Sequence, residues 1–286
     1  MSFNVNDPSG ASGISADITT MASMGAHALP VVTGVLIRDT AEVLESYDID
    51  ADAIAEQARA ILEDAPIAAW KVGFLGSAEG VAAVAEVLAD YADIPLVAYL
   101  SNVSWLDEER QVSYLDAFKE LILPSATVLV GNHQTLIDLL LPEWESERSP
   151  SARELAVAAS SLGTQFVLVT GIQLPDQFID NVLASSQGAL AGERFERFDT
   201  SFVGAGDTLS AALTAILATT EAVDQAVSEA LSFLDQALDS GFRPGMGGVI
   251  PDRFFWALPP EEGEEGAPAE HTGPDDITPS NPRHVH

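Results

Sequence analysis

VGAGDTLSAALTAILA, residues Val203 to Ala218, is a glycine-flanked turn that runs directly into an amphipathic helix. Gly204 and Gly206 have no Cβ atoms, so backbone N–H groups of the turn can approach an anion closely. The apolar residues that follow recur at helical spacing, and the positive end of that helix points at the turn. The stretch therefore predicts a phosphate site at the start of a helix.

An acidic residue, Asp207, stands at the junction of the turn and the helix. A carboxylate is poorly suited to hold a phosphate, but it is well placed to take a proton from a hydroxyl that attacks one. A simpler alternative is that Asp207 only caps the helix after a tight turn. This stretch alone leaves both interpretations open.

A second glycine-rich segment, DPSGASGISAD, spans Asp7 to Asp17 near the N-terminus. Together with KVGFLG (Lys71 to Gly76) and GAGDTLSAAL, it resembles the ribokinase-like kinases of vitamin precursors. VVTGVLIRDTAEV (Val31 to Val43) and PIAAWKVGFLGSAEGVAAVAEVL (Pro66 to Leu88) are most similar to the hydroxymethylpyrimidine/phosphomethylpyrimidine kinases of thiamine biosynthesis. The resemblance runs from about Phe3 to Trp256.

This resemblance implies a ribokinase-like three-layer sandwich with a mainly parallel central sheet. It also implies ATP-dependent phosphorylation of the hydroxymethyl group of a small heterocycle, with Mg²⁺ as cofactor. The acceptor would be 4-amino-5-hydroxymethyl-2-methylpyrimidine or its monophosphate. A pyridoxal-type vitamin kinase and a non-catalytic ligand-binding relative remain alternatives, and a homodimer is left open.

The resemblance also assigns site residues. The catalytic group consists of Asp207 as base and the backbone of Gly204, Ala205 and Gly206, which would hold transition-state charge. The substrate-binding group consists of Asp7, Gly13, Asp17, Arg38 and Phe74. The nucleotide-binding group consists of Asn132, Thr170 and Gly171. Ligands for magnesium stay unassigned.

Several positions depart from the family pattern. Arg38 stands where the pyrimidine kinases typically have a glutamine that reads the aminopyrimidine, and arginine offers donors but no acceptor. Asp207 stands where many members have a cysteine. The family's NxxE element reads NHQT from Asn132, without its glutamate, and the segment YLSN from Tyr99 lacks an expected aspartate. These departures leave open which substrate is bound and whether the residues that bind nucleotide and magnesium are retained.

Short β-branched runs alternate with amphipathic segments rich in alanine and leucine, which predicts an α/β fold. The predicted strands are Phe3 to Asn6, Val31 to Ile37, Ala69 to Phe74, Leu96 to Leu100, Thr127 to Val130 and Phe166 to Thr170. The predicted helices are Ser15 to Met24, Asp50 to Leu62, Glu79 to Tyr91, Asp107 to Leu121, Gln134 to Leu140, Ser151 to Leu162, Asp207 to Ala218 and Glu221 to Ser240. Gly188 to Asp199 is expected to form an antiparallel hairpin.

The composition and charge of the chain bear on its domain organisation, its binding partners and its compartment. The 286 residues, 47% of them hydrophobic, predict one domain over residues 1–258, which the resemblance implies is the kinase domain, and a disordered acidic tail over 259–286. A net charge of −32, from 44 acidic and 12 basic residues, argues against nucleic acid and anionic membranes as partners. The chain has no cysteine and no apolar run of about 18 residues, so a cytoplasmic protein is expected. The acidic surface also suggests a salt-rich environment.

Overall fold

A mixed sheet organises the chain in the computed structural model, which describes residues 1–175 and 177–257. Its strands are β1 (Ser2–Asn6), β2 (Pro30–Arg38), β3 (Val43–Asp48), β4 (Trp70–Val72), β5 (Leu96–Leu100), β6 (Val128–Asn132), β7 (Phe166–Gln173), β8 (Phe178–Ser185) and β9 (Gly188–Glu196). Their order in the sheet is β3-β2-β1-β4-β5-β6-β7-β8-β9. The pairs from β2 through β7 are parallel, whereas β3 at one edge and β8 and β9 at the other are antiparallel.

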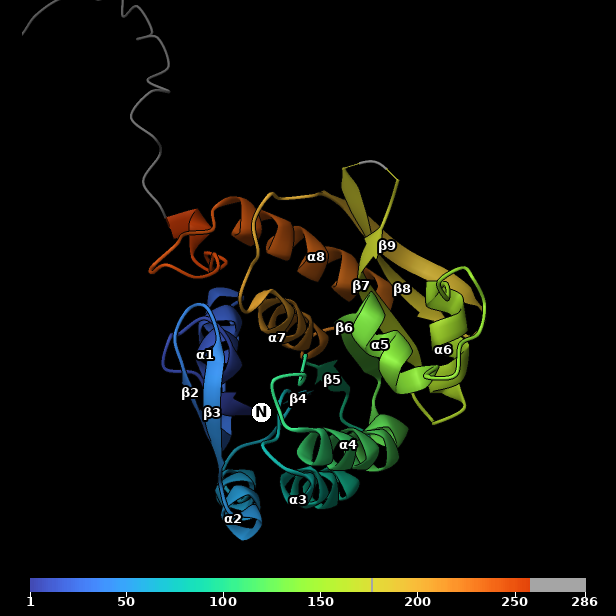
Figure 1. Cartoon of the computed structure of the whole chain (residues 1–286). Helices are drawn as coiled ribbons and strands as arrows, with labels where there is room; N and C mark the ends of the chain where they lie inside the picture. The colour runs from blue at the N-terminus through green and yellow to red at the C-terminus, as the bar shows by residue number, and fades with distance from the viewer. Residues whose placement is uncertain (176, 258–286) are drawn as a thin grey trace, which may run out of the picture. The chain divides into compact units, whose positions relative to one another are not determined.

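Helices cover both faces of this sheet (Figure 1). The helices are α1 (Gly13–Ser23), α2 (Ala51–Leu62), α3 (Ala78–Ala89), α4 (Glu108–Ala117), α5 (His133–Leu140), α6 (Ala152–Ser160), α7 (Ala205–Leu217) and α8 (Val223–Asp239). A π-helical turn (Phe118–Ile122) and two 3₁₀ turns (Leu123–Ser125 and Phe255–Ala257) complete the helical elements of the described residues. The apolar faces of α2 to α6 pack into one core, and those of α7 and α8 pack into a second core on the opposite face.

The alternation of side chains along the central strands separates these two cores. On β6, Val128 and Val130 are buried against α7 and α8, while Leu129 between them is buried in the core of the opposite face. Successive side chains of a strand point to opposite faces, so a run of apolar residues fits a strand that is covered on both sides. The predicted three-layer α/β sandwich is therefore confirmed.

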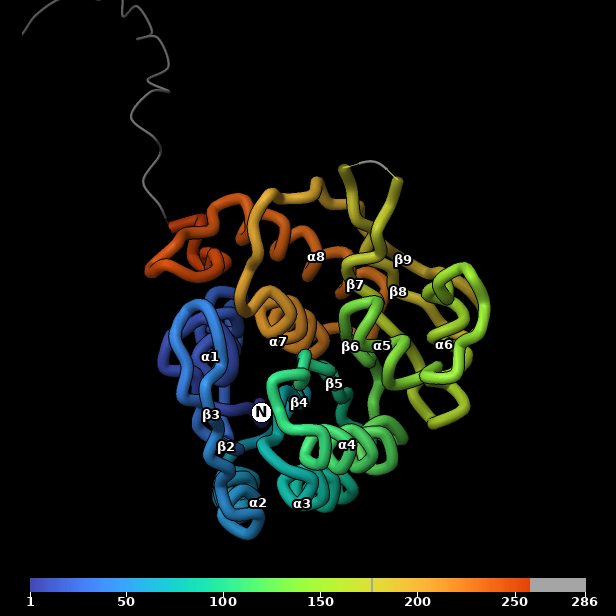
Figure 2. Tube along the Cα trace, in the orientation of Figure 1, coloured from blue at the N-terminus to red at the C-terminus, as the bar shows by residue number. Residues whose placement is uncertain are grey.

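The helix that carries the glycine turn lies deep in the molecule. Every residue of α7 from Asp207 to Leu217 is buried. Two of its alanines, Ala211 and Ala215, form a small core with Met21 of α1, so the N-terminal helix and α7 pack side by side (Figure 2). Small residues allow this close approach, and the packing brings together the two glycine-rich segments of the sequence.

The sequence prediction was wrong about one hairpin and missed two strands. Gly188 to Asp199 contains only one strand, β9, and its antiparallel partner is β8, which precedes it in the chain. The edge strand β3, paired with β2, was also not predicted. The strand predicted over Ala69 to Phe74 is shorter in the structure, where it is limited to β4.

Residues Met1–Phe255 form one compact unit. The acidic tail expected over residues 259–286 lies outside the described residues, so its prediction stays untested. Among the helices that the structure describes, none has both the length and the apolar character needed to cross a membrane.

Candidate active site

The glycine turn forms an open helix N-terminus, as the sequence predicts. Gly204 adopts a left-handed conformation (φ +82°) and precedes α7, which begins at Ala205. No side chain caps this end of the helix. The first N–H groups of an α-helix have no acceptor within the helix, so those of Ala205, Gly206 and Asp207 remain available for an anion.

This geometry rules out the capping interpretation of Asp207. The capping position is occupied by Gly204, and Asp207 lies in the first turn of the helix with its side chain buried. Asp207 is therefore not the N-cap residue, and its carboxylate is committed to contacts outside the helix.

The N-terminal glycine loop packs directly on this turn. A Cβ atom on Gly204 would collide with the backbone carbonyl of Ala11, so only glycine allows this contact. Arg253, which is buried, fastens the two segments together. Its guanidinium donates hydrogen bonds to the carbonyl oxygens of Ala11 (2.5 Å) and Gly10 (3.3 Å) and to the hydroxyl of Thr208 on α7 (3.0 Å).

A cavity of about 360 Å³ opens beside the turn, at the carboxyl ends of β1, β2, β4 and β5. It is lined by five residues of the predicted catalytic and substrate-binding groups: Gly13, Arg38, Phe74, Gly204 and Asp207. Phe74 packs edge-on against Trp105, with ring centroids 5.4 Å apart, and both line the cavity. Two aromatic rings at one wall suit a planar heterocycle. We call this space the acceptor cavity.

Arg38 reaches this cavity with its guanidinium largely covered. Its side chain is 9% exposed, and Nη1 lies 3.6 Å from Oδ2 of Asp7 and 3.4 Å from the hydroxyl of Ser12. Its Nε donates to the backbone carbonyl of Asp39 at 2.9 Å. Arg38 is thus a cationic donor held against the wall of the acceptor cavity.

Asp7 supports the cavity without lining it. Its carboxylate accepts four hydrogen bonds of 2.5 to 2.9 Å from the backbone N–H and hydroxyl groups of Ser9 and Ser12. These bonds fix the loop, and they leave Asp7 beside Arg38 as a neighbouring charge. Asp7 does not line the acceptor cavity and its oxygens are occupied by the loop, so its direct contact with substrate stays a prediction.

Asp17 lies away from the acceptor cavity. It is fully buried on α1, where its carboxylate accepts from Nζ of Lys71 (2.5 Å), the hydroxyl of Ser2 (2.6 Å) and Nδ2 of Asn4 (3.0 Å). It is not among the residues that line the acceptor cavity. Asp17 therefore belongs to a polar network beneath the site.

Two residues of this network reach Asp207 and were not predicted. Nζ of Lys71 lies 3.0 Å from Oδ1 of Asp207, and Nδ2 of Asn4 donates to the same oxygen at 2.8 Å. Lys71 is fully buried. Burial acts to lower the pKa of Lys71, but the attraction of Asp17 and Asp207 outweighs it, so this pKa is raised. A lysine within the apolar strand WKV, in a chain with only two lysines, was the available signal.

A second cavity of about 350 Å³ lies on the other side of the turn. It is lined by the three predicted nucleotide-binding residues, Asn132, Thr170 and Gly171, together with Ala205 and Gly206 of the turn. Phe202 lines both this nucleotide cavity and the acceptor cavity. The structure therefore places the glycine turn between two adjoining spaces.

The nucleotide cavity is lined by one basic and one acidic side chain, Arg197 and Glu196, and by neutral polar residues that include Asn132. The side chain of Asn132 accepts from the N–H of Gln134 (3.0 Å) and caps α5, so its oxygen is partly committed to structure. Arg197 is a basic residue at the cavity wall that the sequence analysis did not select. Within the described residues, no group of three His, Cys, Asp or Glu side chains could hold a metal ion.

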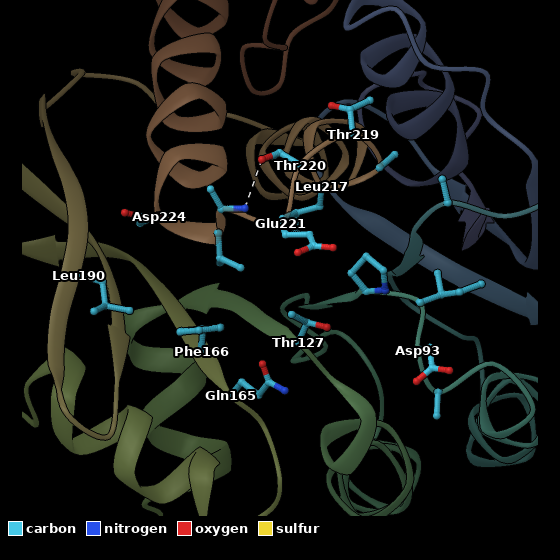
Figure 3. Close-up of a pocket in the computed structure, with 17 residues that line it drawn as sticks. Asp93, Thr127, Gln165, Phe166, Leu190, Leu217, Thr219, Thr220, Glu221 and Asp224 are labelled. Atoms are coloured by element: carbon cyan, nitrogen blue, oxygen red, sulfur yellow. Dashed lines mark hydrogen bonds between the residues drawn. The ribbon is translucent and has the colours of Figure 1, made fainter.

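A broader hollow of about 1020 Å³ lies at the opposite, amino ends of β5, β6 and β7 (Figure 3). Asp93, Glu221 and Asp224 stand around it, and none of its lining residues is basic. Negative side chains repel a phosphorylated ligand. We therefore locate the candidate active site at the glycine turn.

Comparison with known proteins identifies the family of this chain. A sequence model described as phosphomethylpyrimidine kinase matches residues 7–251. The chain belongs to the phosphomethylpyrimidine kinase family. A hydroxymethylpyrimidine/phosphomethylpyrimidine kinase of Streptomyces coelicolor is 31% identical over 88% of this chain and 93% of the relative. The enzyme of the same name from Salmonella typhimurium is 30% identical over 88% of this chain and 95% of the relative.

Solved kinase structures share the fold. An ADP complex of Bacillus subtilis pyridoxal kinase superimposes with a TM-score of 0.80 at 25% identity, covering 90% of this chain and 98% of the other. The phosphomethylpyrimidine kinase of Clostridium difficile gives a TM-score of 0.67 at 22% identity, covering 82% of this chain and 98% of the other. The predictions of a ribokinase-like fold and of a phosphotransferase are confirmed.

Proposed function

We propose that this kinase transfers the γ-phosphoryl group of ATP to the hydroxymethyl group of a small planar heterocycle. The preferred acceptor is 4-amino-5-hydroxymethyl-2-methylpyrimidine or its monophosphate, which agrees with the names of the curated relatives. One observation carries the proposal. The glycine turn lies between an aromatic cavity that suits the acceptor and a second cavity that suits the nucleotide.

In this proposal the acceptor lies in its cavity with its hydroxymethyl group at the turn. Asp207 takes the hydroxyl proton as the oxygen attacks the γ-phosphorus. A bond forms between that oxygen and phosphorus, the bond to the bridging oxygen of ATP breaks, and ADP leaves with the electron pair. The N–H groups of Ala205 and Gly206 offset the negative charge on the transferred group.

The site offers side chains and backbone groups for ATP, whereas Mg²⁺ would be bound mainly through the phosphates of ATP. Asn132, Thr170, Gly171 and Arg197 would hold the nucleotide, and the open end of α7 would meet its phosphates. Mg²⁺ in such sites is bound largely by phosphate oxygens and water, so a dedicated cluster of protein carboxylates is not required. When bound, the ion neutralises phosphate charge.

The acceptor can be identified directly. Purified protein is incubated with ATP and Mg²⁺ and with hydroxymethylpyrimidine, its monophosphate or pyridoxal in turn, and products are read by mass. The proposal predicts a gain of one phosphate on the pyrimidine compounds. Phosphorylation of pyridoxal alone would favour the second candidate, a pyridoxal kinase, which the similarity to the Bacillus subtilis structure supports. Absence of product with every compound would assign the chain to a non-catalytic binding class.

A further inference from the structure

Tyr99 lies beside the glycine turn and has no part in the reaction described above. It stands one residue before the end of β5, is half-buried, and lines the acceptor cavity. Its hydroxyl forms no hydrogen bond within the described part of the chain. The buried polar side-chain atoms without a partner in those residues belong to Thr20 and Trp70, so the Tyr99 oxygen is not sealed in the core. This hydroxyl is therefore available to a ligand.

The hydroxyl end of Tyr99 is directed at the glycine turn. A Cβ atom on Gly206 would collide with the hydroxyl oxygen and with ring carbons Cζ and Cε2, so glycine at this position makes room for the phenol. Gly206 lies in the first turn of α7, where the backbone N–H groups have no acceptor within the helix. The phenol O–H and these N–H groups are thus neighbouring donors.

The ring of Tyr99 is held in place from two directions. It packs against the core that α7 and α8 form on one face of the sheet. Nζ of Lys71 lies 5.7 Å from the ring centroid, and an ammonium group over an aromatic face is attracted to it. The backbone of Tyr99 pairs with Val130 in the parallel sheet. A donor fixed in this way loses little conformational entropy when it meets a ligand.

The phenol of Tyr99 also keeps the proton that it would donate. Burial, together with the nearby Asp207 and Asp17, raises the pKa of Tyr99, so the phenol stays neutral. Two cationic side chains near the turn are already committed to other partners. Nζ of Lys71 contacts both carboxylates, and the guanidinium of Arg253 binds the N-terminal loop and α7. Tyr99 can therefore supply a hydrogen bond that these cations do not.

Tyr99 and Gly206 stand on the two sides of the path that the phosphoryl group takes in the proposed reaction. Tyr99 lines the acceptor cavity but not the nucleotide cavity, whereas Gly206 lines the nucleotide cavity. A phosphoryl group that crosses from the second space to the first approaches the phenol as it moves. A hydrogen bond that strengthens along this path lowers the barrier, because it is worth more in the transition state than in the bound ATP.

We propose that the hydroxyl of Tyr99 is a catalytic hydrogen-bond donor to the phosphoryl group that passes from ATP to the acceptor. It acts beside the N–H groups of Ala205 and Gly206 and keeps its own proton throughout. The inference rests on the proposed function and adds a side chain to the backbone donors of the turn.

Tyr99→Phe tests the proposal, because it removes the hydroxyl and retains the ring that packs on the core and on Lys71. The single-turnover rate at saturating ATP and acceptor should fall by about ten- to a hundredfold, the usual effect of one hydrogen bond to a charged group. Tyr91→Phe is the matched control, since Tyr91 packs on Trp70 and lines neither cavity. Its rate should equal that of the parent.

A second measurement does not depend on turnover. Calorimetric titration without ATP compares hydroxymethylpyrimidine with its monophosphate, which carries the phosphate on the acceptor side. Tyr99→Phe should bind the monophosphate about tenfold more weakly than the parent does, and it should bind the unphosphorylated pyrimidine equally well. If pyridoxal is the acceptor, pyridoxal and pyridoxal phosphate replace this pair.

The two measurements separate a catalytic contact from a structural one. A single-turnover rate in Tyr99→Phe equal to the parental rate would overturn the proposal, and so would an unchanged affinity for the monophosphate. An equal loss of affinity for both ligands would also overturn it, because a residue that only shapes the cavity affects both. A selective loss for the monophosphate, in a protein that phosphorylates no acceptor, would retain Tyr99 as a phosphate ligand and reject the proposed function.

Discussion

Asp207 links the acceptor cavity to the buried network beneath it, because the residue lines the cavity and its side chain is held by Asn4 and Lys71. Asp207→Asn should lower the phosphorylation rate by about a hundred- to ten-thousand-fold, the usual contribution of a general base. The amide oxygen can still accept from Asn4 and Lys71, so acceptor affinity and folding should change little.

The measurement is single-turnover product formation alongside equilibrium binding of the acceptor. Asp224→Asn is a suitable control, since Asp224 is exposed at the start of α8 and lines the hollow at the opposite end of the sheet. Parental rates in Asp207→Asn would show that this carboxylate does not act as the base.

Arg38 lines the acceptor cavity, and the proposed function has it contact the edge of the acceptor ring. Arg38→Gln should shift selectivity toward hydroxymethylpyrimidine over pyridoxal by roughly tenfold, the equivalent of about one hydrogen bond. The reason is that an amide offers both a donor and an acceptor to the ring edge. Asp7 keeps its four hydrogen bonds from the serine loop, so the loop should survive the change.

The readout is the ratio of kcat/KM for the two acceptors. Arg59→Gln provides the control, because Arg59 pairs with Glu86 on the exposed surface. If the ratio is the same in Arg38→Gln and in the parent, Arg38 does not contact the acceptor.

Individual site residues were predictable where a motif fixed both the residue and its place at the end of a strand. Arg38, Phe74 and Asp207 lie at the acceptor cavity as expected. Asp7 and Asp17 were predicted in contact with substrate, but their partners are side chains and backbone groups of the protein. A sequence gives the type and order of residues, whereas the partner of a buried charge depends on how separate strands and helices pack.

Interior elements were easier to predict than the edges of the sheet. The parallel strands β5 and β6 read as apolar runs because helices cover both of their faces. The edge strand β3 has the sequence VLESYD and is only partly buried, so its apolar pattern is weak. For β9, the alternation was recognised but its partner was not, since pairing depends on the strand order and not on the local pattern.

Whether activity requires the close contact between the N-terminal loop and the start of α7 can be tested by comparing alanine substitutions at two glycines. Gly204 and Gly10 both have positive φ angles, +82° and +73°, so alanine at either position costs about 1–2 kcal/mol of backbone strain. Only at Gly204 would the new Cβ also meet the backbone of Ala11, whereas at Gly10 nothing lies within 4 Å. Gly204→Ala should therefore separate the two segments and abolish phosphorylation.

Chemical denaturation and activity assays check this difference. Gly10→Ala should lose no more unfolding free energy than the strain alone, and it should retain activity. Equal losses in the two variants would mean that the close approach at Gly204 is not required.

The whole molecule brings its functional residues together because parallel strands present their carboxyl ends at one edge of the sheet. Arg38 ends β2, Asn132 ends β6, and Thr170 of β7 pairs in register with Asn132. The mainly parallel sheet that the family resemblance implies is sufficient to expect this convergence. They could not predict the two separate cavities, since these depend on side chains such as Phe202 that pack from a later segment.

The net charge of −32 affects the stability of the entire chain, since 44 acidic side chains repel one another with only 12 basic ones to offset them. Salt shortens the range of this repulsion from about 30 Å at 0.01 M to about 3 Å at 1 M. We therefore expect the melting temperature to rise by more than about 5 °C between these concentrations of KCl, which corresponds to roughly 2 kcal/mol for a domain of this size.

Differential scanning calorimetry in KCl and in NaCl separates charge screening from other effects of salt. Screening depends on ionic strength, so the two salts should give the same curve, with much of the gain below about 0.15 M, where the Debye length has already fallen to about 8 Å. A gain confined to molar salt, or one that differs between the two cations, would indicate ion-specific effects. Equal melting temperatures at low and molar salt would show that the acidic surface is tolerated without screening, and the inference of a salt-rich environment would then fail.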